Sequence, residues 1–92
     1  MKRVRIYVTG RVQGVFFRVY TRDMARQLSI CGYVRNLRDG RVEIMAEGTE
    51  DSLRKMVTWA KKEGSPHSRI DRTEEEWDDI EKSQYSDFQI TY

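Results

Sequence analysis

The 92-residue chain is poor in the residues that form disulfides and bind transition metals. Its one cysteine, Cys31, has no internal partner, and between Ile30 and Gly32 it is expected to be a small core residue. Its one histidine, His67, lies in a turn-rich segment beside Pro66. These two residues make no convincing transition-metal cluster, and no nearby residue completes a Ser/His/Asp or Cys/His arrangement. Most common hydrolase mechanisms are therefore excluded.

The sequence also lacks an apolar run of membrane-spanning length, and its first residues pass directly into strand-like sequence without the apolar core of a signal peptide. We therefore expect a cytoplasmic protein. Apolar residues make up 38% of the chain and charged residues 35%, as in globular proteins with one core. The length suffices for a single domain, expected to span residues 1–92, and leaves no room for a separate cofactor domain.

The net charge of +2 is unevenly distributed along the chain. Residues 1–46 hold ten Lys and Arg against three Asp and Glu, a balance of +7. Residues 47–92 hold seven against twelve, a balance of −5. This asymmetry indicates either a positive surface that attracts an anion or two oppositely charged faces that keep the protein in solution.

Hydrophobic periodicity predicts the elements of the first half of the chain. Alternating apolar residues predict a strand over residues 3–9 with one buried face. Helical spacing predicts a helix over residues 17–29 that packs on the sheet. Its buried stripe is expected to consist of Phe17, Tyr20, Met24 and Leu28. Strands over residues 32–37 and 41–47 flank Arg38-Asp39-Gly40, whose Asp-Gly pair is typical of a hairpin turn.

The second half predicts one more helix and two more strands. Thr49 is suited to cap a helix that Gly64 and Pro66 end. The apolar face of this helix consists of Leu53, Met56, Val57 and Ala60. Residues 70–77 are expected to form a charged edge strand, and residues 88–92 a short last strand. This β-α-β-β-α-β order predicts an α+β, ferredoxin-like sandwich: an antiparallel sheet with two helices on one face, plus a short C-terminal strand.

Function must come from particular residues, because many unrelated functions use this fold. The connection Gly10–Arg18 has two glycines but no Walker or dinucleotide motif. The helix after it lacks an N-cap side chain, and Arg18 lies where the helix dipole disfavours a cation by about 0.3–1 kcal/mol. A bound anion accounts for both features, since unit charges about 4 Å apart gain roughly 4 kcal/mol at an effective dielectric of about 20. The alternative is an ordinary glycine-containing loop with Arg18 in solvent.

Asn36 shares strand parity with Val34, which places both on one face near the end of the second strand, where an apolar residue is more usual. Taken alone, it is a functional amide or the residue that begins the Asp-Gly turn. The neighbouring sequence bears on this choice. Residues 10–18, GRVQGVFFR, resemble the acylphosphatase signature G-x-V-Q-G-V-x-F-R, and residues 32–43, GYVRNLRDGRVE, resemble its second signature, G-[WY]-V-x-N-x-x-D-G-x-V-E.

The resemblance has no gap in either motif and extends to Tyr92. Its departures are mild: Tyr33 stands where Trp is commoner, Cys31 replaces an aliphatic residue, and Ser65 stands in a turn that is often Gly-Pro-Pro. None of these departures touches the expected chemistry.

This resemblance implies an acylphosphatase that hydrolyses the carboxyl-phosphate bond of a small-molecule acyl phosphate to a carboxylate and inorganic phosphate, without metal or cofactor. It implies two catalytic residues, Arg18 binding the phosphate and Asn36 orienting the attacking water. The backbone amides that complete the phosphate-binding loop are those of Gln13, Gly14, Val15, Phe16, Phe17 and Arg18. A carboxylate leaving group needs no general acid, so positioning and charge stabilisation suffice. A monomer is the default expectation.

Two other functions share the predicted fold. RNA-recognition domains have the same order of elements, but they stack bases on aromatic residues of two central strands. Here Phe16, Phe17 and Tyr20 fall in a loop and a helix, so we expect no nucleic-acid partner. The lack of a membrane-spanning apolar run leads us to expect no membrane partner. The second alternative is a regulatory or carrier-type domain, like the acylphosphatase-like segment of hydrogenase-maturation carbamoyltransferases.

Overall fold

The computed structural model describes all 92 residues and has the predicted elements in the predicted order. Its strands and helices are β1 (Lys2–Arg11), α1 (Phe17–Gln27), β2 (Cys31–Asn36), β3 (Val42–Gly48), α2 (Glu50–Lys62), β4 (Arg69–Asp79) and β5 (Phe88–Ile90). No apolar stretch in either helix is long enough to span a bilayer.

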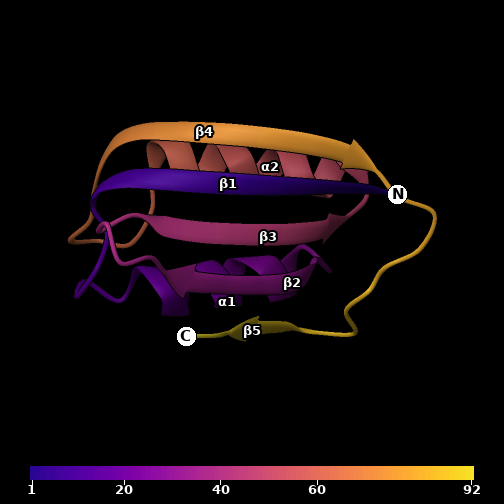
Figure 1. Cartoon of the computed structure of the whole chain (residues 1–92), viewed down its shortest axis with the longest axis horizontal. Coiled ribbons are helices and arrows are strands. Elements are labelled where there is room, and N and C mark those ends of the chain that lie inside the picture. Colours follow the sequence, from indigo (N-terminus) through magenta and orange to yellow (C-terminus); the bar gives the residue numbers. More distant parts are fainter.

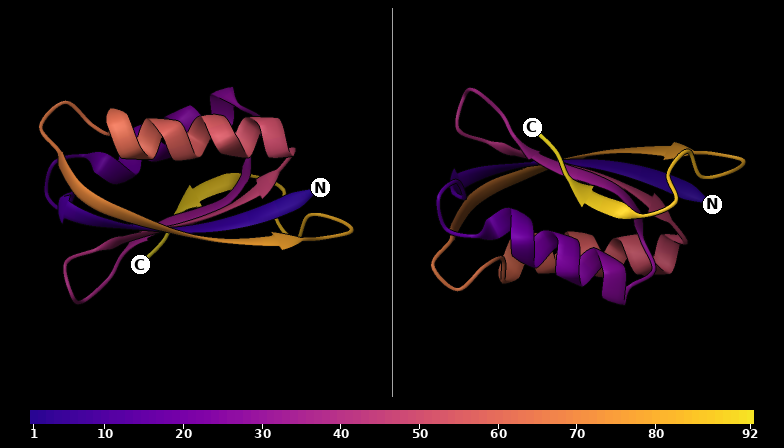
Figure 2. Two further views of the ribbon diagram at one scale, coloured as in Figure 1. Left: turned by 90° about the horizontal axis from the view of Figure 1, so that it is seen from above. Right: turned by 90° about the horizontal axis from the view of Figure 1, so that it is seen from below.

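The strands form one sheet in the order β4-β1-β3-β2-β5 (Figure 1). The first four strands in this order are antiparallel, and β5 pairs in parallel with β2. Both helices lie on the same face of the sheet (Figure 2). We call the other face the open face. This arrangement confirms the ferredoxin-like sandwich and its short C-terminal strand, although the last strand ends at Ile90 rather than Tyr92.

The core lies between the sheet and the two helices, as the alternation in the first strand predicts. Val4, Ile6 and Val8 of β1 are fully buried, and each such side chain stabilises the fold by about 1.5–3 kcal/mol. All four predicted apolar positions of α2 are buried as well. The Thr49 hydroxyl accepts a hydrogen bond from the Ser52 amide at 3.2 Å, which confirms the predicted cap.

The predicted stripe of α1 is partly wrong. The helix ends at Gln27 rather than Ser29, and its buried residues are Phe17, Thr21 and Ala25, with Met24 and Leu28 partly buried at the border. Tyr20 is 45% exposed. Thr21, rather than Tyr20, lies in the core. Its hydroxyl can be buried without water because it donates a hydrogen bond to the Phe17 carbonyl oxygen at 2.8 Å.

Cys31 is half-buried, so the prediction of a core cysteine is also wrong. It has the strand parity of Tyr33 and Arg35 and therefore belongs to the open face.

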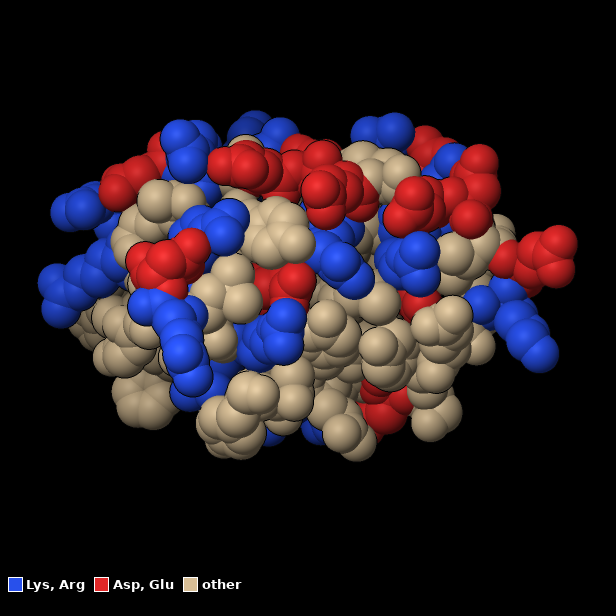
Figure 3. All heavy atoms as spheres, viewed as in Figure 1, with Lys and Arg blue, Asp and Glu red and all other residues tan.

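The charged edge strand is confirmed as β4, which extends two residues further at its C-terminal end. Acidic side chains follow its edge in Figure 3, and such charge discourages pairing with another chain.

Candidate functional site

The pairing of β1 with β4 is irregular at Gly10, near the end of β1. The register between β1 and β4 shifts between Thr9 and Gly10, and Gly10 has φ +143°. A Cβ atom here would overlap the Arg69 carbonyl oxygen and lie 2.9 Å from the Asp71 amide nitrogen. Only glycine fits this close approach of two strands. Gly10 begins the segment of residues 10–18, which we call the cradle loop.

The cradle loop contains a series of backbone N–H groups without an acceptor. Gly14 (φ +76°) and Phe16 (φ +61°) are both left-handed, and Phe16 occupies the N-cap of α1. No side chain caps the helix and its first turn has no acidic residue, which confirms the uncapped N-terminus predicted from sequence. None of the seven N–H groups of residues 13–19 donates a hydrogen bond. Successive amides of this kind, together with a helix N-terminus, form a concave site for an anion.

Two side chains hold the cradle loop in place, one within the loop and one from a distant segment. Gln13 Nε2 donates to the carbonyl oxygens of Leu37 (2.8 Å) and Arg41 (2.9 Å), at the hairpin turn between β2 and β3. On the other side, the buried Ser65 hydroxyl donates to the Val15 carbonyl at 2.8 Å. These hydrogen bonds involve the Gln13 side chain and the Val15 carbonyl oxygen of the loop. The backbone N–H groups of the loop therefore remain free to bind an anion.

Arg18 is half-buried in the first turn of α1 and has no carboxylate within salt-bridge distance, whereas most of the basic residues form ion pairs. Its guanidinium carbon lies 5.2 Å from the centroid of the Tyr92 ring. Such a cation–π contact orients the group without neutralising it. Arg18 therefore offers an uncompensated positive charge next to the free amides of its own loop.

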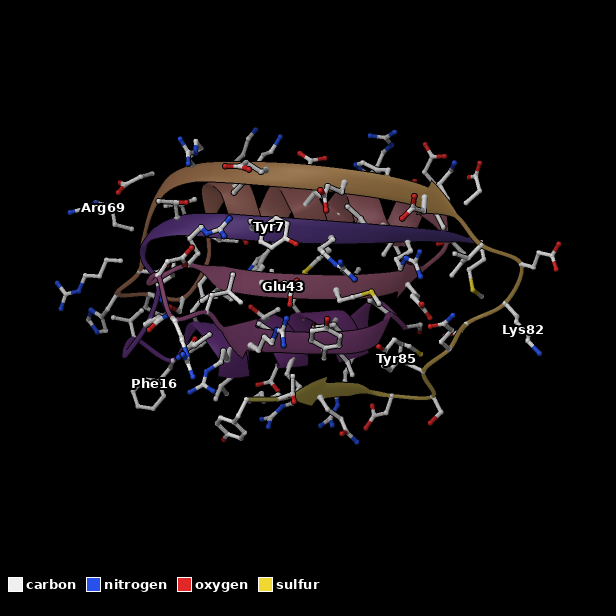
Figure 4. All side chains as sticks on the ribbon, in the orientation of Figure 1. Tyr7, Phe16, Glu43, Arg69, Lys82 and Tyr85 are labelled. Carbon is white, nitrogen blue, oxygen red and sulfur yellow. The ribbon has the colours of Figure 1, made fainter.

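Beside Arg18 lies a pocket of about 410 Å³ with a largely apolar lining that includes Val12, Phe16, Ile90 and Tyr92. Phe16 is 73% exposed although it is a large apolar side chain. Figure 4 shows it at the end of the molecule where the cradle loop lies, away from Glu43 and Tyr85. The site thus joins an anion-binding surface to an apolar surface.

Asn36 lies at the end of β2, at the same end of the sheet as the cradle loop. It pairs with Val42 of β3, which in turn pairs with Val8 of β1, two residues before the loop begins. The Asn36 side chain makes no hydrogen bond, and its Oδ1 atom is buried without a partner. A buried polar atom of this kind normally binds a partner, so Asn36 is available to orient a small polar molecule.

The turn after Asn36 is held by Asp39, whose carboxylate accepts hydrogen bonds from the Arg41 amide (3.1 Å) and the Arg41 side chain (2.8 Å). The bond from the Arg41 amide is the main cause that lowers the pKa of Asp39. The sequence therefore brings Asn36 and its turn to the cradle loop, and Gln13 makes the contact between them.

Sequence reasoning also missed the buried carboxylate of Glu43 on the open face. Glu43, which is labelled in Figure 4, is 3% exposed. Its carboxylate lies between Arg35, at 2.6 Å, and Arg5, at 3.6 Å. Its hydrogen bond raises the pKa of Arg35. The sequence signal for this buried carboxylate is that an acidic residue stands between two apolar neighbours in β3. Its side chain belongs to the open face, whereas Asn36 has the parity of the helix-covered face.

Comparisons with known proteins agree on one family. The sequence profile described as Acylphosphatase matches residues 4–90. The chain is 53% identical to an acylphosphatase of Rubrobacter xylanophilus over 75 residues, which cover 82% of this chain and 67% of the relative. It is 46% identical to acylphosphatase-2 of Homo sapiens over 93 residues, which cover 100% and 94%. The crystal structure of the Bacillus subtilis acylphosphatase superposes with a TM-score of 0.93 at 39% identity and covers both chains completely.

Proposed function

This chain belongs to the acylphosphatase family, and we propose that Arg18, Asn36 and the amides of the cradle loop carry out its acylphosphatase activity. The observation that carries the proposal is the coincidence, on one loop, of the N–H groups of residues 13–18, which have no acceptors, and an arginine without a carboxylate. Both kinds of donor suit a phosphate group, and the guanidinium can bind it through two oxygens.

In this proposal the loop amides and Arg18 bind the phosphate of the acyl phosphate, and they stabilise the charge that develops on its oxygens during transfer. Asn36 holds a water molecule in line with the bond that breaks. The water oxygen forms a bond to phosphorus while the bond between phosphorus and the acyl oxygen breaks, and its electron pair leaves with the carboxylate. A phosphate oxygen of the substrate takes the proton of the water, because neither Arg18 nor Asn36 is a useful base near neutral pH.

We extend the proposal to the setting of this reaction. The enzyme acts as one domain of residues 1–92, as a monomer in the cytoplasm, without metal, nucleic acid or membrane. The tyrosine rings of the open face support the exclusion of nucleic acid, because arginines of the protein already make cation–π contacts with them. The guanidinium of Arg41 lies 4.9 Å from the Tyr7 ring, and that of Arg35 lies 5.7 Å from the Tyr33 ring.

Hydrolysis of benzoyl phosphate in EDTA tests the roles of the two residues. Arg18→Ala is expected to lose both substrate binding and turnover, and Asn36→Ala mainly turnover, each by about 10²-fold or more. Arg22→Ala is the matched control, since it removes the same charge one turn later on α1, where Arg22 pairs with Asp23 at 3.3 Å. Its kinetic constants should stay within about twofold of wild type.

The control separates a specific role of Arg18 from a general effect of positive charge. Near-wild-type hydrolysis by folded Arg18→Ala or Asn36→Ala would refute the assignment of that residue. An equal loss in Arg22→Ala would show that overall charge, rather than the cradle loop, governs the rate.

A further inference from the structure

The side chain of Gln13 links the cradle loop to the hairpin that carries Asn36. Its Nε2 atom donates to the Leu37 carbonyl at 2.8 Å and to the Arg41 carbonyl at 2.9 Å. These residues close the hairpin turn, because the Leu37 amide also donates to the Arg41 carbonyl at 2.8 Å. Leu37 follows Asn36 directly in the sequence. One side-chain amide thus fixes the loop against the end of β2.

The contact requires an N–H₂ group, since both partners are carbonyl oxygens. With the amide reversed, Gln13 Oε1 would face two oxygens and no donor. Both N–H bonds are used, so this nitrogen has no donor left for a substrate. The side-chain nitrogen of Gln13 therefore holds the loop in place and is not free to contact the reacting atoms.

The second side chain that holds the loop does so from a different direction. Ser65 lies beyond the end of α2 and binds the Val15 carbonyl, so it has no connection to the strand of Asn36. The two contacts can be removed separately. Ser65 therefore provides a natural control for a loss of loop order that does not involve the hairpin.

We infer that Gln13 is a positioning residue for hydrolysis, which keeps the phosphate on the cradle loop in line with the water held by Asn36. This inference rests on the proposed function. In-line attack tolerates little displacement, since about 1 Å of misplacement costs on the order of 10²-fold in rate. The amides that bind phosphate belong to the loop backbone. Loss of the Gln13 contacts should therefore lower turnover more than phosphate affinity.

Gln13→Met tests this inference because it keeps the length of the side chain and removes both hydrogen bonds. The values of kcat, KM for benzoyl phosphate and the inhibition constant of inorganic phosphate are measured in the wild-type and Asn36→Ala backgrounds. We expect about tenfold lower kcat in the wild-type background, with the inhibition constant within about twofold, and less than about twofold further loss of kcat with Asn36→Ala. Ser65→Ala should lower kcat by the same factor in both backgrounds.

An unchanged kcat in Gln13→Met, or equal losses in both backgrounds, would overturn the inference. So would an inhibition constant that rises by as much as kcat falls, because the substitution would then damage phosphate binding itself. Failure of the proposed function has a different signature: Asn36→Ala alone would then keep wild-type turnover.

Gln13→Glu tests the same contact if Gln13→Met does not fold. Its carboxylate repels the two carbonyl oxygens at pH 7, whereas a protonated carboxyl group can donate one hydrogen bond. The kcat of Gln13→Glu relative to wild type should therefore rise as the pH falls below about 4.5. A constant ratio between pH 7 and pH 4 would contradict the positioning role.

Discussion

Gly10→Ala is predicted to be one of the most destabilising substitutions at the entrance to the cradle loop. The added methyl group would overlap the Arg69 carbonyl oxygen and crowd the Asp71 amide, both in the backbone of β4. Neither atom can move without shifting its strand. The φ of +143° adds a second cost, because residues with a Cβ atom rarely adopt it.

The expected loss of stability is the sum of these two costs. Forcing a non-glycine residue into a sparsely populated backbone region costs about 1–3 kcal/mol, and overpacking costs about 1–3 kcal/mol more. We expect a loss of about 3–5 kcal/mol, a large part of the roughly 5–14 kcal/mol typical for a chain of this length.

Gly14→Ala is the matched control in the same loop. Gly14 also has a positive φ, +76°, but no atom lies within 4 Å of the position of its added Cβ. Only the backbone cost applies, about 1–2 kcal/mol for a left-handed residue, and the reduced entropy of the unfolded chain offsets about 0.4–1 kcal/mol of it. The net loss should therefore lie between about 0 and 1.6 kcal/mol.

Urea unfolding, followed by tryptophan fluorescence, measures both free energies. With a urea dependence of about 1–3 kcal/mol per molar, Gly10→Ala should lower the midpoint by about 1 M or more, and by at least twice as much as Gly14→Ala. Equal losses for the two variants, or a loss under about 1 kcal/mol for Gly10→Ala, would refute the argument from close strand approach.

Three further predictions concern the helix cap, an ion pair and the apolar pocket. Thr49→Ala should reduce the free energy of unfolding by about 0.5–2 kcal/mol in urea titrations, because the hydrogen bond to the Ser52 amide is lost. The hydrogen bond with Lys61 is the main cause that lowers the pKa of Glu75. The ionised carboxylate therefore stabilises the fold above its unfolded-state pKa of about 4.3. This stabilisation is lost as the pH falls through the folded-state pKa. Glu75→Gln should therefore show a weaker loss of thermal stability than wild type between pH 5 and about pH 3, and equal pH profiles would contradict this. If the apolar pocket beside Arg18 holds the acyl group, Phe16→Ala should raise KM for benzoyl phosphate about fivefold more than KM for acetyl phosphate. An equal effect on both substrates would contradict this role of the pocket.

The sequence predicted every element because the local patterns agree with the tertiary arrangement. Alternation in β1, the apolar face of α2 and the Thr49 cap each depend on residues close in sequence. The stripe of α1 was mispredicted at Tyr20 because hydrophobicity alone favours tyrosine over threonine, whereas the Thr21 hydroxyl is satisfied within the helix. Cys31 was misplaced because the apolar neighbours of a residue do not decide which face of a strand it occupies.

The candidate site was predicted in part. The uncapped helix and the position of Arg18 were evident from local sequence, and the motif resemblance selected Asn36. The contacts that join these parts were not predictable in this way. Gln13 binds carbonyl groups 24 and 28 residues away, and Ser65 binds one 50 residues away. Any residue supplies a carbonyl oxygen, so no residue type marks the acceptor of such a bond.

The most direct test of the central claim is a titration of ¹⁵N-labelled protein with inorganic phosphate, followed by amide chemical shifts. We expect the largest changes at the free amides of residues 13–18, and we expect them to disappear in Arg18→Ala. Changes confined to another surface, such as the groove of about 490 Å³ beside Tyr33 and Tyr85, would contradict the claim that the cradle loop binds the phosphate group.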